Sequence, residues 1–355
     1  MVNEPFEPLI YDRTQVYVGA LATVSARDMP HRGFTTIRDV GGPPQGLKAV
    51  IDQGLIEGPR ILPCAFISQS SGHGDFDPRE TYLSPYFTGQ IDKAAIFGWT
   101  LIADGVPEVM KATRENLRSG ATQIKIMGSG SVTGAHDRFD VTENTFEELQ
   151  AIVKEAEKWG TYATIHAYSD EGVRNAVNAG VRAVEHALFA SDETMKLMKE
   201  KDVFFSTQFF AFSATSEMAG FSGDTAVKYE EAKAGAEAGC KRAKKYGLEM
   251  AWGTDTFGSL DIQTYQKDEW TARAKYFTPY EILVQATSLN AELLARAGKR
   301  HPYQEGPLGV IKPGAYADII IVDGNPLEDI SLLSDPEKNL KLIMKDGKIH
   351  KNRIQ

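Results

Sequence analysis

Apolar, β-branched segments alternate with amphipathic segments along most of this 355-residue chain. Seven segments of the first kind have the length and composition of buried strands. They are GFTTIRD (33–39), RILPCAF (60–66), TQIKIMG (122–128), YATIH (162–166), RAVEH (182–186), VFFSTQF (203–209) and EMAWGTD (249–255). We predict one strand in each of these ranges.

The segments between these strands have the spacing of helices, and several close on a glycine, as helices often do. They include residues 106–120, 145–160, 169–180 and 228–247, and residues 14–32 form another helical pattern ahead of the first strand. Strands that are separated by helices pair in parallel through right-handed crossovers. The pattern therefore predicts an α/β fold.

A closed barrel and an open doubly wound sheet both fit this alternation, and the polar residues at the strand ends favour the barrel. Asp39, Lys125, His166, His186 and Asp255 all lie near the C-terminal ends of different predicted strands. In a (β/α)8 TIM barrel these ends meet at one face, where the active site lies, whereas an open sheet spreads them along an edge. No glycine fingerprint of a dinucleotide fold follows the first strand.

The C-terminal part has a different pattern, in which short apolar segments are joined by turn sequences. Residues 308–330 and 340–351 contain the turn signals PG, DGNP and KDG. We expect a small β-module here. The predicted division is a barrel domain over residues 1–300 and part of a β-sandwich over residues 301–355.

Composition narrows the range of partners. The net charge of -9 and the absence of a block of like charge argue against nucleic acid and anionic membranes, so a small-molecule or dipeptide-like substrate is expected. No apolar run approaches the ~18 residues of a spanning helix. Cys64 and Cys240 are too few for a disulfide framework. Cytoplasm is the expected compartment, and a signal segment upstream of this sequence is the alternative.

Two histidines and one lysine are the candidate reactive groups. His166 and His186 close two strands that lie twenty residues apart, and imidazoles on neighbouring parallel strands point into one mouth, as a divalent metal requires. Lys125 lies in the apolar segment QIKIM, where a buried ammonium is costly. This lysine is therefore paired, extended to solvent, or neutral and chemically modified.

Several stretches together resemble the metal-dependent amidohydrolase superfamily, in particular its imidazolonepropionase-like branch with the prolidase-like Xaa-dipeptidases and the ochratoxin-hydrolysing amidases. The matching stretches follow the family's order over nearly the whole chain. They are residues 33–42, QIKIMGSGSV (123–132), residues 164–187, WGTDT (252–256), ATSLNAELL (286–294) and residues 308–330.

The resemblance implies a set of metal ligands, with zinc as the expected metal. Lys125 would be a carboxylated lysine that bridges two ions, and His166 and His186 would bind the second ion. Asp255 would bind the first ion and carry the proton of the activated hydroxide. The resemblance also implies that His73, in the loop SQSSGHGD, and Tyr168 contact substrate, and His136 is a weaker candidate.

One element of the family pattern is absent from this sequence. The superfamily supplies two more ligands from an HxH pair at the end of the first barrel strand, and this chain has no HxH. His31 lies in a predicted helix. We therefore expect a barrel that lacks its first strand, an N-terminally truncated family member, at most one metal ion per chain, and an unpaired, exposed strand edge near residues 308–324.

Two functions are compatible with these residues. The first is hydrolysis of amide or peptide C–N bonds by a metal-activated hydroxide, in a dipeptidase or an amidase of N-acyl amino acids. The second is a catalytically inactive amidohydrolase homologue that acts at most as a binding or oligomer-forming protein. Upstream sequence that carries HxH would favour the enzyme.

Overall fold

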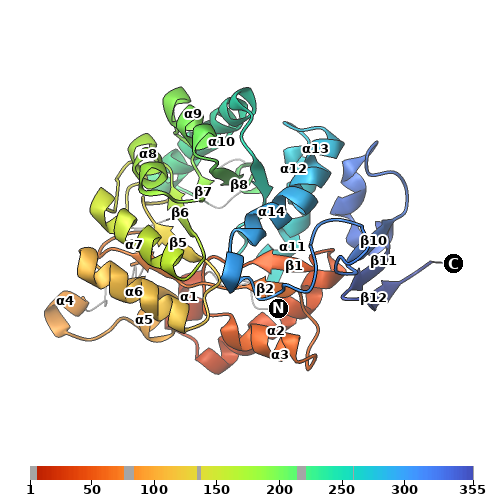
Figure 1. Ribbon diagram of the computed structural model, residues 1–355, viewed down its shortest axis with the longest axis horizontal. Coiled ribbons are helices and arrows are strands. Elements are labelled where there is room, and N and C mark those ends of the chain that lie inside the picture. Colours follow the sequence, from red (N-terminus) through yellow and green to blue (C-terminus); the bar gives the residue numbers. More distant parts are fainter. Residues whose placement is uncertain (1–5, 76–83, 134–136, 214–220, 259, 355) are drawn as a thin grey trace.

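The computed structural model describes residues 6–75, 84–133, 137–213, 221–258 and 260–354, and it shows parallel strands surrounded by helices (Figure 1). The strands of this part are β1 (Thr36–Arg38), β2 (Arg60–Leu62), β3 (Phe66–Ser68), β4 (Thr100–Ile102), β5 (Ile124–Met127), β6 (Ala163–Ala167), β7 (Ala183–His186), β8 (Phe204–Thr207) and β9 (Met250–Trp252). Each of the seven segments predicted as strands overlaps at least one of them. The predicted α/β fold is confirmed.

The helices lie outside the strands, and their ends follow local sequence signals. Thr145 and Glu148 form a capping box at the start of α7, while α8 and α10 end at Gly180 and Gly247 in the left-handed conformation. The helices are α1 (Phe6–Tyr11), α2 (Gln15–His31), α3 (Gln45–Asp52), α4 (Pro85–Thr88), α5 (Lys93–Ile96), α6 (Val106–Arg118), α7 (Phe146–Lys158), α8 (Asp170–Ala179), α9 (Asp192–Glu200), α10 (Gly223–Tyr246), α11 (Leu260–Thr264), α12 (Glu269–Arg273), α13 (Pro279–Val284), α14 (Asn290–Ala295) and α15 (Pro336–Asn339).

The strand order is β4-β3-β5-β6-β7-β8-β9, and β1 pairs in parallel with β2. The strand predicted over residues 60–66 contains β2 and only the first residue of β3, and Pro63, Cys64 and Ala65 separate these two strands. Strand β2 pairs with β1, and β3 pairs with β4 and β5. The short strand β4 was not predicted, because three residues between helical segments carry no readable periodicity.

Strand β1 at the start of the barrel and strand β9 at its end lie on the two sides of a seam. Among the described residues no backbone ladder joins β9 to β1, although the rings of Phe34 and Trp252 lie 5.6 Å apart between centroids. In the same region the Thr36 hydroxyl and the Trp252 indole N–H are buried without a hydrogen-bond partner. These two side-chain groups thus remain unpaired at the seam, whereas the backbone N–H and C=O of Trp252 are hydrogen-bonded to the Asn290 side chain. The absence of a first barrel strand stays a prediction.

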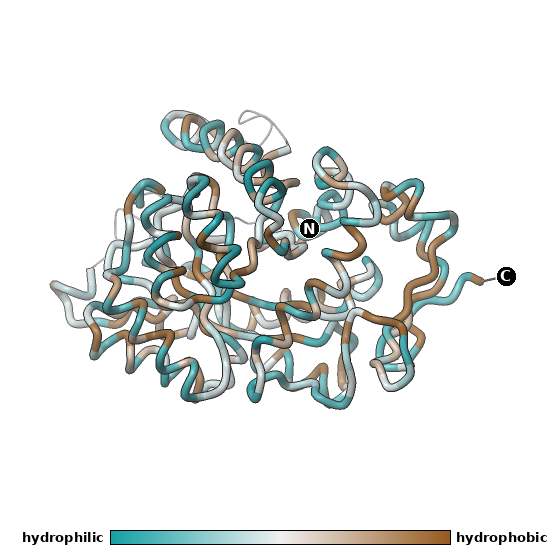
Figure 2. Tube along the Cα trace, turned by 45° about the horizontal axis from the view of Figure 1, so that its top comes forward, coloured by the Kyte–Doolittle hydropathy of each residue, from teal (hydrophilic) through white to brown (hydrophobic). Residues whose placement is uncertain are grey.

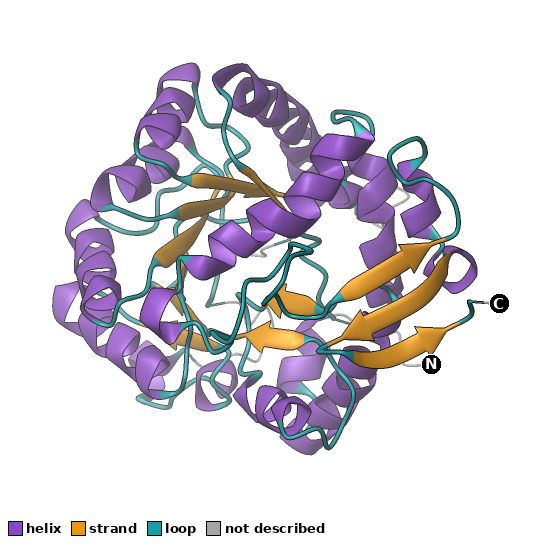
Figure 3. Cartoon of the chain, turned by 45° about the vertical axis from the view of Figure 1, so that its right-hand side comes forward, coloured by secondary structure: helices purple, strands orange, loops and turns teal. Residues whose placement is uncertain are grey.

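The C-terminal module is a three-stranded antiparallel sheet that lies beside the barrel (Figure 3). It contains β10 (Ile319–Val322), β11 (Leu340–Lys345) and β12 (Lys348–Asn352), with Asp346 and Gly347 at positive φ in the predicted KDG turn. The expectation that the 308–324 segment lacks a partner is wrong, because β10 pairs with β11. It remains an edge strand, with Ile320 and Ile321 exposed. The division at residue 300 stays a prediction.

Alternation along the strands separates an apolar outer layer from a polar barrel interior. Ile124, Ile126 and Ile165 are fully buried in one cluster with residues of α7 and α8, and Figure 2 shows both hydrophobic and hydrophilic turns on the surrounding helices. Lys125 and Thr164 alternate with these residues and so face the interior. None of the helices in the described residues is long and apolar enough to cross a membrane.

Candidate active site

The two strand-end histidines lie next to each other at the mouth of the barrel. His166 of β6 pairs with Glu185 of β7, so these two side chains should lie on the same face of the sheet. The next residue, His186, would then point to the opposite face, away from His166, if the strand alternated regularly. Instead, His186 and Ala187 adopt positive φ values of 73° and 44°, which breaks the alternation. The two imidazole centroids are consequently 4.7 Å apart. Strain of this kind commonly marks functional sites.

Each of these imidazoles has one nitrogen held by a carbonyl oxygen. His166 Nε2 lies 3.1 Å from Gly130 O, and His186 Nδ1 lies 2.9 Å from Gln208 Oε1. A carbonyl oxygen only accepts hydrogen bonds, so these nitrogens carry the protons. His166 Nδ1 and His186 Nε2 are then the nitrogens with free lone pairs, the arrangement that metal-binding histidines show.

Electrostatics keeps both rings neutral. Burial lowers the pKa of His166 well below its ordinary value, and the neighbouring charges of His73, His186 and Lys125 lower it further. Burial also lowers the pKa of His186, although Asp255 opposes this shift. Neutral rings retain the lone pairs that a cation requires.

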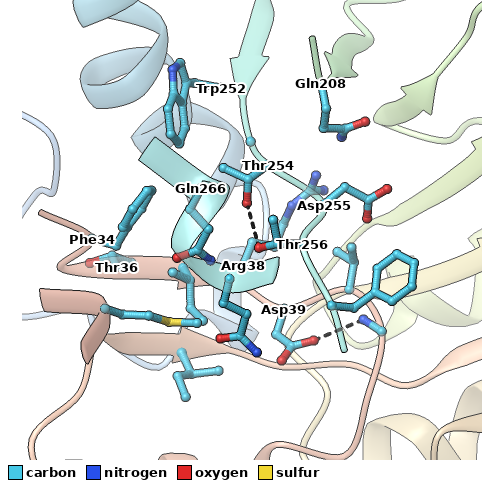
Figure 4. Close-up of a pocket in the computed structure, with 18 of the residues that line it drawn as sticks. Phe34, Thr36, Arg38, Asp39, Gln208, Trp252, Thr254, Asp255, Thr256 and Gln266 are labelled. Carbon is cyan, nitrogen blue, oxygen red and sulfur yellow. Dashed lines mark hydrogen bonds between the residues drawn. The ribbon is translucent and has the colours of Figure 1, made fainter. Parts of the chain in front are cut away.

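Asp255 brings a carboxylate close to the His186 ring. It follows β9, has a positive φ of 52°, and places Oδ2 4.0 Å from His186 Nε2, with 45% of its side chain exposed. Figure 4 shows Asp255 and Gln208 beside the same pocket, together with the Thr254 and Thr256 hydroxyls, which are hydrogen-bonded to each other. A half-exposed carboxylate beside a free imidazole nitrogen can exchange protons with solvent.

Lys125 reaches the same mouth from β5. It is 5% exposed and pairs with Thr164, two residues before the Met127–His166 pair. It lines the same cavity as His166, His186 and Asp255, and its charge contributes to the lowered pKa of both imidazoles. The four predicted metal-site residues therefore converge on one face of the barrel.

A buried ionic layer lies beneath this mouth. Arg38 Nη2 of β1 donates to Glu185 Oε1 at 2.7 Å, and Thr164 Oγ1 donates to the same oxygen at 2.6 Å. Burial alone would raise the pKa of Glu185, but the charges of Arg38 and Lys125 hold it at about 2. Glu185 is thus an anion whose charge offsets those of its two basic neighbours.

His73 and Tyr168 cover the histidine pair from the loop side. The His73 ring stacks on His166 with centroids 4.6 Å apart, and its Nδ1 lies 3.1 Å from Asp137 Oδ2. Tyr168 packs against both His166 and His186. Burial, with the charges of Asp255 and Asp137, raises the pKa of Tyr168, so its hydroxyl stays protonated and can donate a hydrogen bond.

The structure adds residues that were not predicted from the sequence. Gln208 orients His186, Asp137 orients His73, and Glu143 accepts a hydrogen bond from the His73 backbone. Gln208 lies at the end of a predicted strand, the same kind of position that singled out the histidines. Asp137 and Glu143 lie in a connecting segment without such a signal. His136 lies outside the described residues.

Burial of Glu143 makes stability depend on pH. Burial raises the pKa of this carboxyl from its ordinary 4.5 to about 7, against the lowering effects of the His73 backbone N–H and the His73 charge. Between these two pKa values the folded chain binds more protons than the unfolded chain, so the free energy of unfolding falls as pH rises.

We therefore expect Glu143→Gln to raise the free energy of unfolding relative to wild type at pH 8, by up to about 3 kcal/mol, and to lose this advantage below pH 4.5. Chemical denaturation at several pH values measures the difference. The matched control is Glu147→Gln, at an exposed position of α7, which should follow wild type. A Glu143→Gln advantage that is equal at all pH values would contradict the assignment.

The donors fit part of a metal site. The 4.0 Å between His186 Nε2 and Asp255 Oδ2 is longer than the roughly 3.3–3.6 Å that separates two donors of one tetrahedral ion with bonds of ~2.0–2.2 Å, and His166 supplies a second neutral imidazole. In the described part of the chain, however, no group of three His, Cys, Asp or Glu side chains is close enough to hold an ion. The described residues thus bring two imidazoles and one carboxylate close together, but not at the spacing of a complete three-ligand site.

A cavity of about 1540 Å³ connects this site with the seam between β1 and β9. Its lining includes His73, His166, His186 and Asp255, and it continues to Phe34 and Trp252. Figure 4 shows side chains of β1 and of the segment after β9 around this space. A cavity of this size exceeds the ≈ 300–1,000 Å³ of typical ligand pockets, so it can admit a dipeptide-sized molecule.

Fold and site together define an α/β barrel protein with a polar, histidine-lined mouth. The family model described as amidohydrolase family matches residues 3–350, and the chain belongs to this family. It is 32% identical over 330 residues to ochratoxinase from Aspergillus niger, a match that covers 90% of this chain. The chain spans 66% of the length of that curated relative.

Solved structures agree with this assignment. The crystal structure of an amidohydrolase matches with a TM-score of 0.87 and 34% identity, over 98% of this chain and 83% of that one. A prolidase complexed with N-methylphosphonate-L-proline matches with a TM-score of 0.88 and 31% identity, over 99% and 83%. These matches confirm the resemblance that the sequence motifs indicated.

Proposed function

We propose that this protein hydrolyses amide or peptide C–N bonds with the help of a divalent metal ion, zinc being the first candidate. The observation that carries the proposal is the pair of neutral imidazoles with fixed tautomers, His166 and His186, next to Asp255 at one barrel mouth. Membership in the amidohydrolase family supports it. Dipeptides and N-acyl amino acids are the proposed substrates, because prolidase and ochratoxinase are among the similar proteins.

His166 Nδ1, His186 Nε2 and Asp255 are the groups that would hold the ion, and they would have to move closer together to do so. A bound divalent cation supplies a Lewis acid and lowers the pKa of water. Asp255 is placed to accept a proton from water and to donate it to the leaving amine, because its side chain reaches both solvent and His186. Tyr168, which stays protonated, would donate a hydrogen bond to the substrate carbonyl oxygen, and His73 would contact the substrate beside it.

Lys125 is proposed as a further, covalently modified ligand. Addition of CO₂ to the neutral amine forms one N–C bond, releases one proton and produces a carbamate anion. This conversion removes a buried cation and supplies oxygen donors beside the histidine pair. Arg38 would remain to balance Glu185, to which it is hydrogen-bonded.

The test is to reconstitute the protein with zinc, manganese or cobalt and to assay panels of dipeptides and N-acyl amino acids. We expect metal-dependent release of free amino acid that a chelator abolishes. Absence of turnover with every metal and substrate would refute the proposal and would favour an inactive homologue that binds or oligomerises.

A prediction about Gln208 tests the metal assignment without an activity assay. Gln208→Leu removes the oxygen that accepts the Nδ1 proton of His186, so this ring can rotate or change tautomer. We expect zinc affinity to fall by about 10–100-fold, as measured by competition with a chelating dye. The exposed Gln90→Leu is the matched control and should retain wild-type affinity. Equal affinity in the Gln208 variant would contradict the role given to Gln208 in holding His186 for the metal.

A further inference from the structure

The loop that carries His73 is held on its backbone side by a buried carboxyl group. Glu143, on the connection between β5 and α7, accepts a hydrogen bond from the His73 backbone N–H at 2.9 Å through Oε1. Its residue is only 6% exposed. The contact joins positions that are 70 residues apart, so it depends entirely on the tertiary fold.

The loop and the carboxyl group fit together without spare room. A Cβ atom placed on Gly72 would lie 2.4 Å from Glu143 Oε2 and 2.7 Å from Ser68 Oγ. The backbone of the loop can approach this closely only because residue 72 has no side chain. Glu143 therefore determines how near the loop comes to the barrel.

The second carboxyl oxygen of Glu143 makes this placement unfavourable for the stability of the folded chain. Glu143 Oε2 is buried and has no hydrogen-bond partner among the described residues. A buried acceptor without a partner destabilises the folded state, and such groups call for an explanation. Among the described residues, the hydrogen bond from the His73 backbone is the only one that the Glu143 side chain makes.

The His73 ring is held separately. Asp137 Oδ2 accepts from His73 Nδ1 and also from the Ser131 backbone N–H at 2.8 Å. The ring thereby stays stacked on His166. Two carboxyl groups therefore position His73: Glu143 holds its backbone, and Asp137 orients its ring. His73 and Asp137 are also the charged groups that act on Glu143.

We propose that Glu143 is a positioning residue that acts through His73, placing the imidazole at the mouth of the barrel for contact with substrate. This inference rests on the proposed hydrolase function. It assigns no direct contact between Glu143 and the substrate, and it deepens the role of the loop at residues 68–75.

A double-mutant cycle tests the proposal. Glu143→Ala should lower kcat/KM for the best substrate by up to about 10²-fold, because small displacements of a positioned group have effects of this size. Glu143→Gln, which keeps an acceptor oxygen for the His73 N–H, should restore most of the activity. In a His73→Ala background, Glu143→Ala should cause little further loss, since the group that it positions is gone.

The controls separate positioning from general destabilisation. Glu147→Ala, at an exposed position of α7, should keep wild-type kcat/KM. In Gly72→Ala, the added Cβ would collide with Glu143 and push the loop away from it, so this variant should lower kcat/KM as Glu143→Ala does. It replaces Glu143→Ala in the experiment if that variant does not fold. Wild-type kcat/KM in Glu143→Ala, or an equally large additional loss in the His73→Ala background, would overturn the proposal.

Hydrogen exchange tests the contact independently of catalysis. Exchange of the His73 amide should become about 10-fold faster or more in Glu143→Ala but not in Glu143→Gln, because only the alanine variant removes the acceptor. This result would support the positioning contact even if no substrate were turned over, in which case the hydrolase proposal alone would fail. Unchanged exchange in the alanine variant would overturn the inference.

Discussion

Replacing Asp255 with asparagine is expected to lower kcat/KM by about 10²–10⁴-fold. Asparagine has nearly the same shape, but its amide can neither accept the proton of a water molecule nor return it to the leaving amine. Asp255 is the acidic group 4.0 Å from the free nitrogen of His186, and its 45% exposed side chain reaches solvent. Initial rates with the reconstituted protein measure the loss.

The fold should survive this substitution. Asparagine tolerates the positive φ of residue 255, so the melting temperature should match that of wild type. Asp202→Asn is a matched control, since Asp202 also has a positive φ, of 56°, and lies before β8, away from the strand ends that form the mouth. Retention of more than about one third of wild-type kcat/KM by Asp255→Asn would show that another group carries the proton.

Replacing Arg273 with methionine is expected to lower the free energy of unfolding by about 3–5 kcal/mol. Arg273 and Glu269 have side chains with no solvent exposure, and Arg273 Nε donates to Glu269 Oε1 at 2.6 Å. The variant leaves the Glu269 carboxylate buried without its cation. Such a loss is large compared with the ~5–15 kcal/mol stability of a typical domain.

The same arginine also connects the strands that support the site. Arg273 Nη2 donates to Thr207 O of β8 and Ala251 O of β9, at 2.6 and 2.9 Å. Because Gln208 directly follows Thr207, loosening of β8 should reach His186 as well. We therefore expect the Arg273 variant to lose zinc affinity in addition to stability.

Chemical denaturation measures the first effect, with Arg118→Met as the matched control. Arg118 is 73% exposed and pairs with Glu115 on the surface of α6. Its removal should change the free energy of unfolding by less than about 1 kcal/mol. Equal destabilisation by both substitutions would contradict the role given to the buried pair.

Much of the barrel could be predicted from the sequence, because its signals are local. A strand buried beneath helices requires an apolar run, and seven such runs correspond to observed strands. Helix ends at Gly180 and Gly247 follow from the left-handed backbone that glycine adopts readily. Even the gathering of His166, His186 and Asp255 followed from sequence, because parallel strands in a barrel deliver their C-terminal ends to one face.

Other features depend on contacts between distant parts of the chain. The strand predicted over residues 60–66 ends at Leu62, where β2 pairs with β1, and a separate strand, β3, begins at Phe66. Strand β3 pairs with β4, and β4 is too short to carry a periodic signal. The strand that was expected to lack a partner, β10, finds one in β11. Strand pairing of this kind depends on which backbone groups meet in space, and no local pattern records it.

The surroundings of the two histidines show most clearly which features the local sequence predicts and which depend on the tertiary structure. The strand pattern alone was enough to predict imidazoles at two adjacent strand ends. Which nitrogen of each carries the proton depends on Gly130 and Gln208, which are 36 and 22 residues away along the chain. The placement of His73 depends likewise on Asp137 and Glu143. A hydrogen bond needs an acceptor within about 3 Å, and only the folded chain brings these distant groups that close.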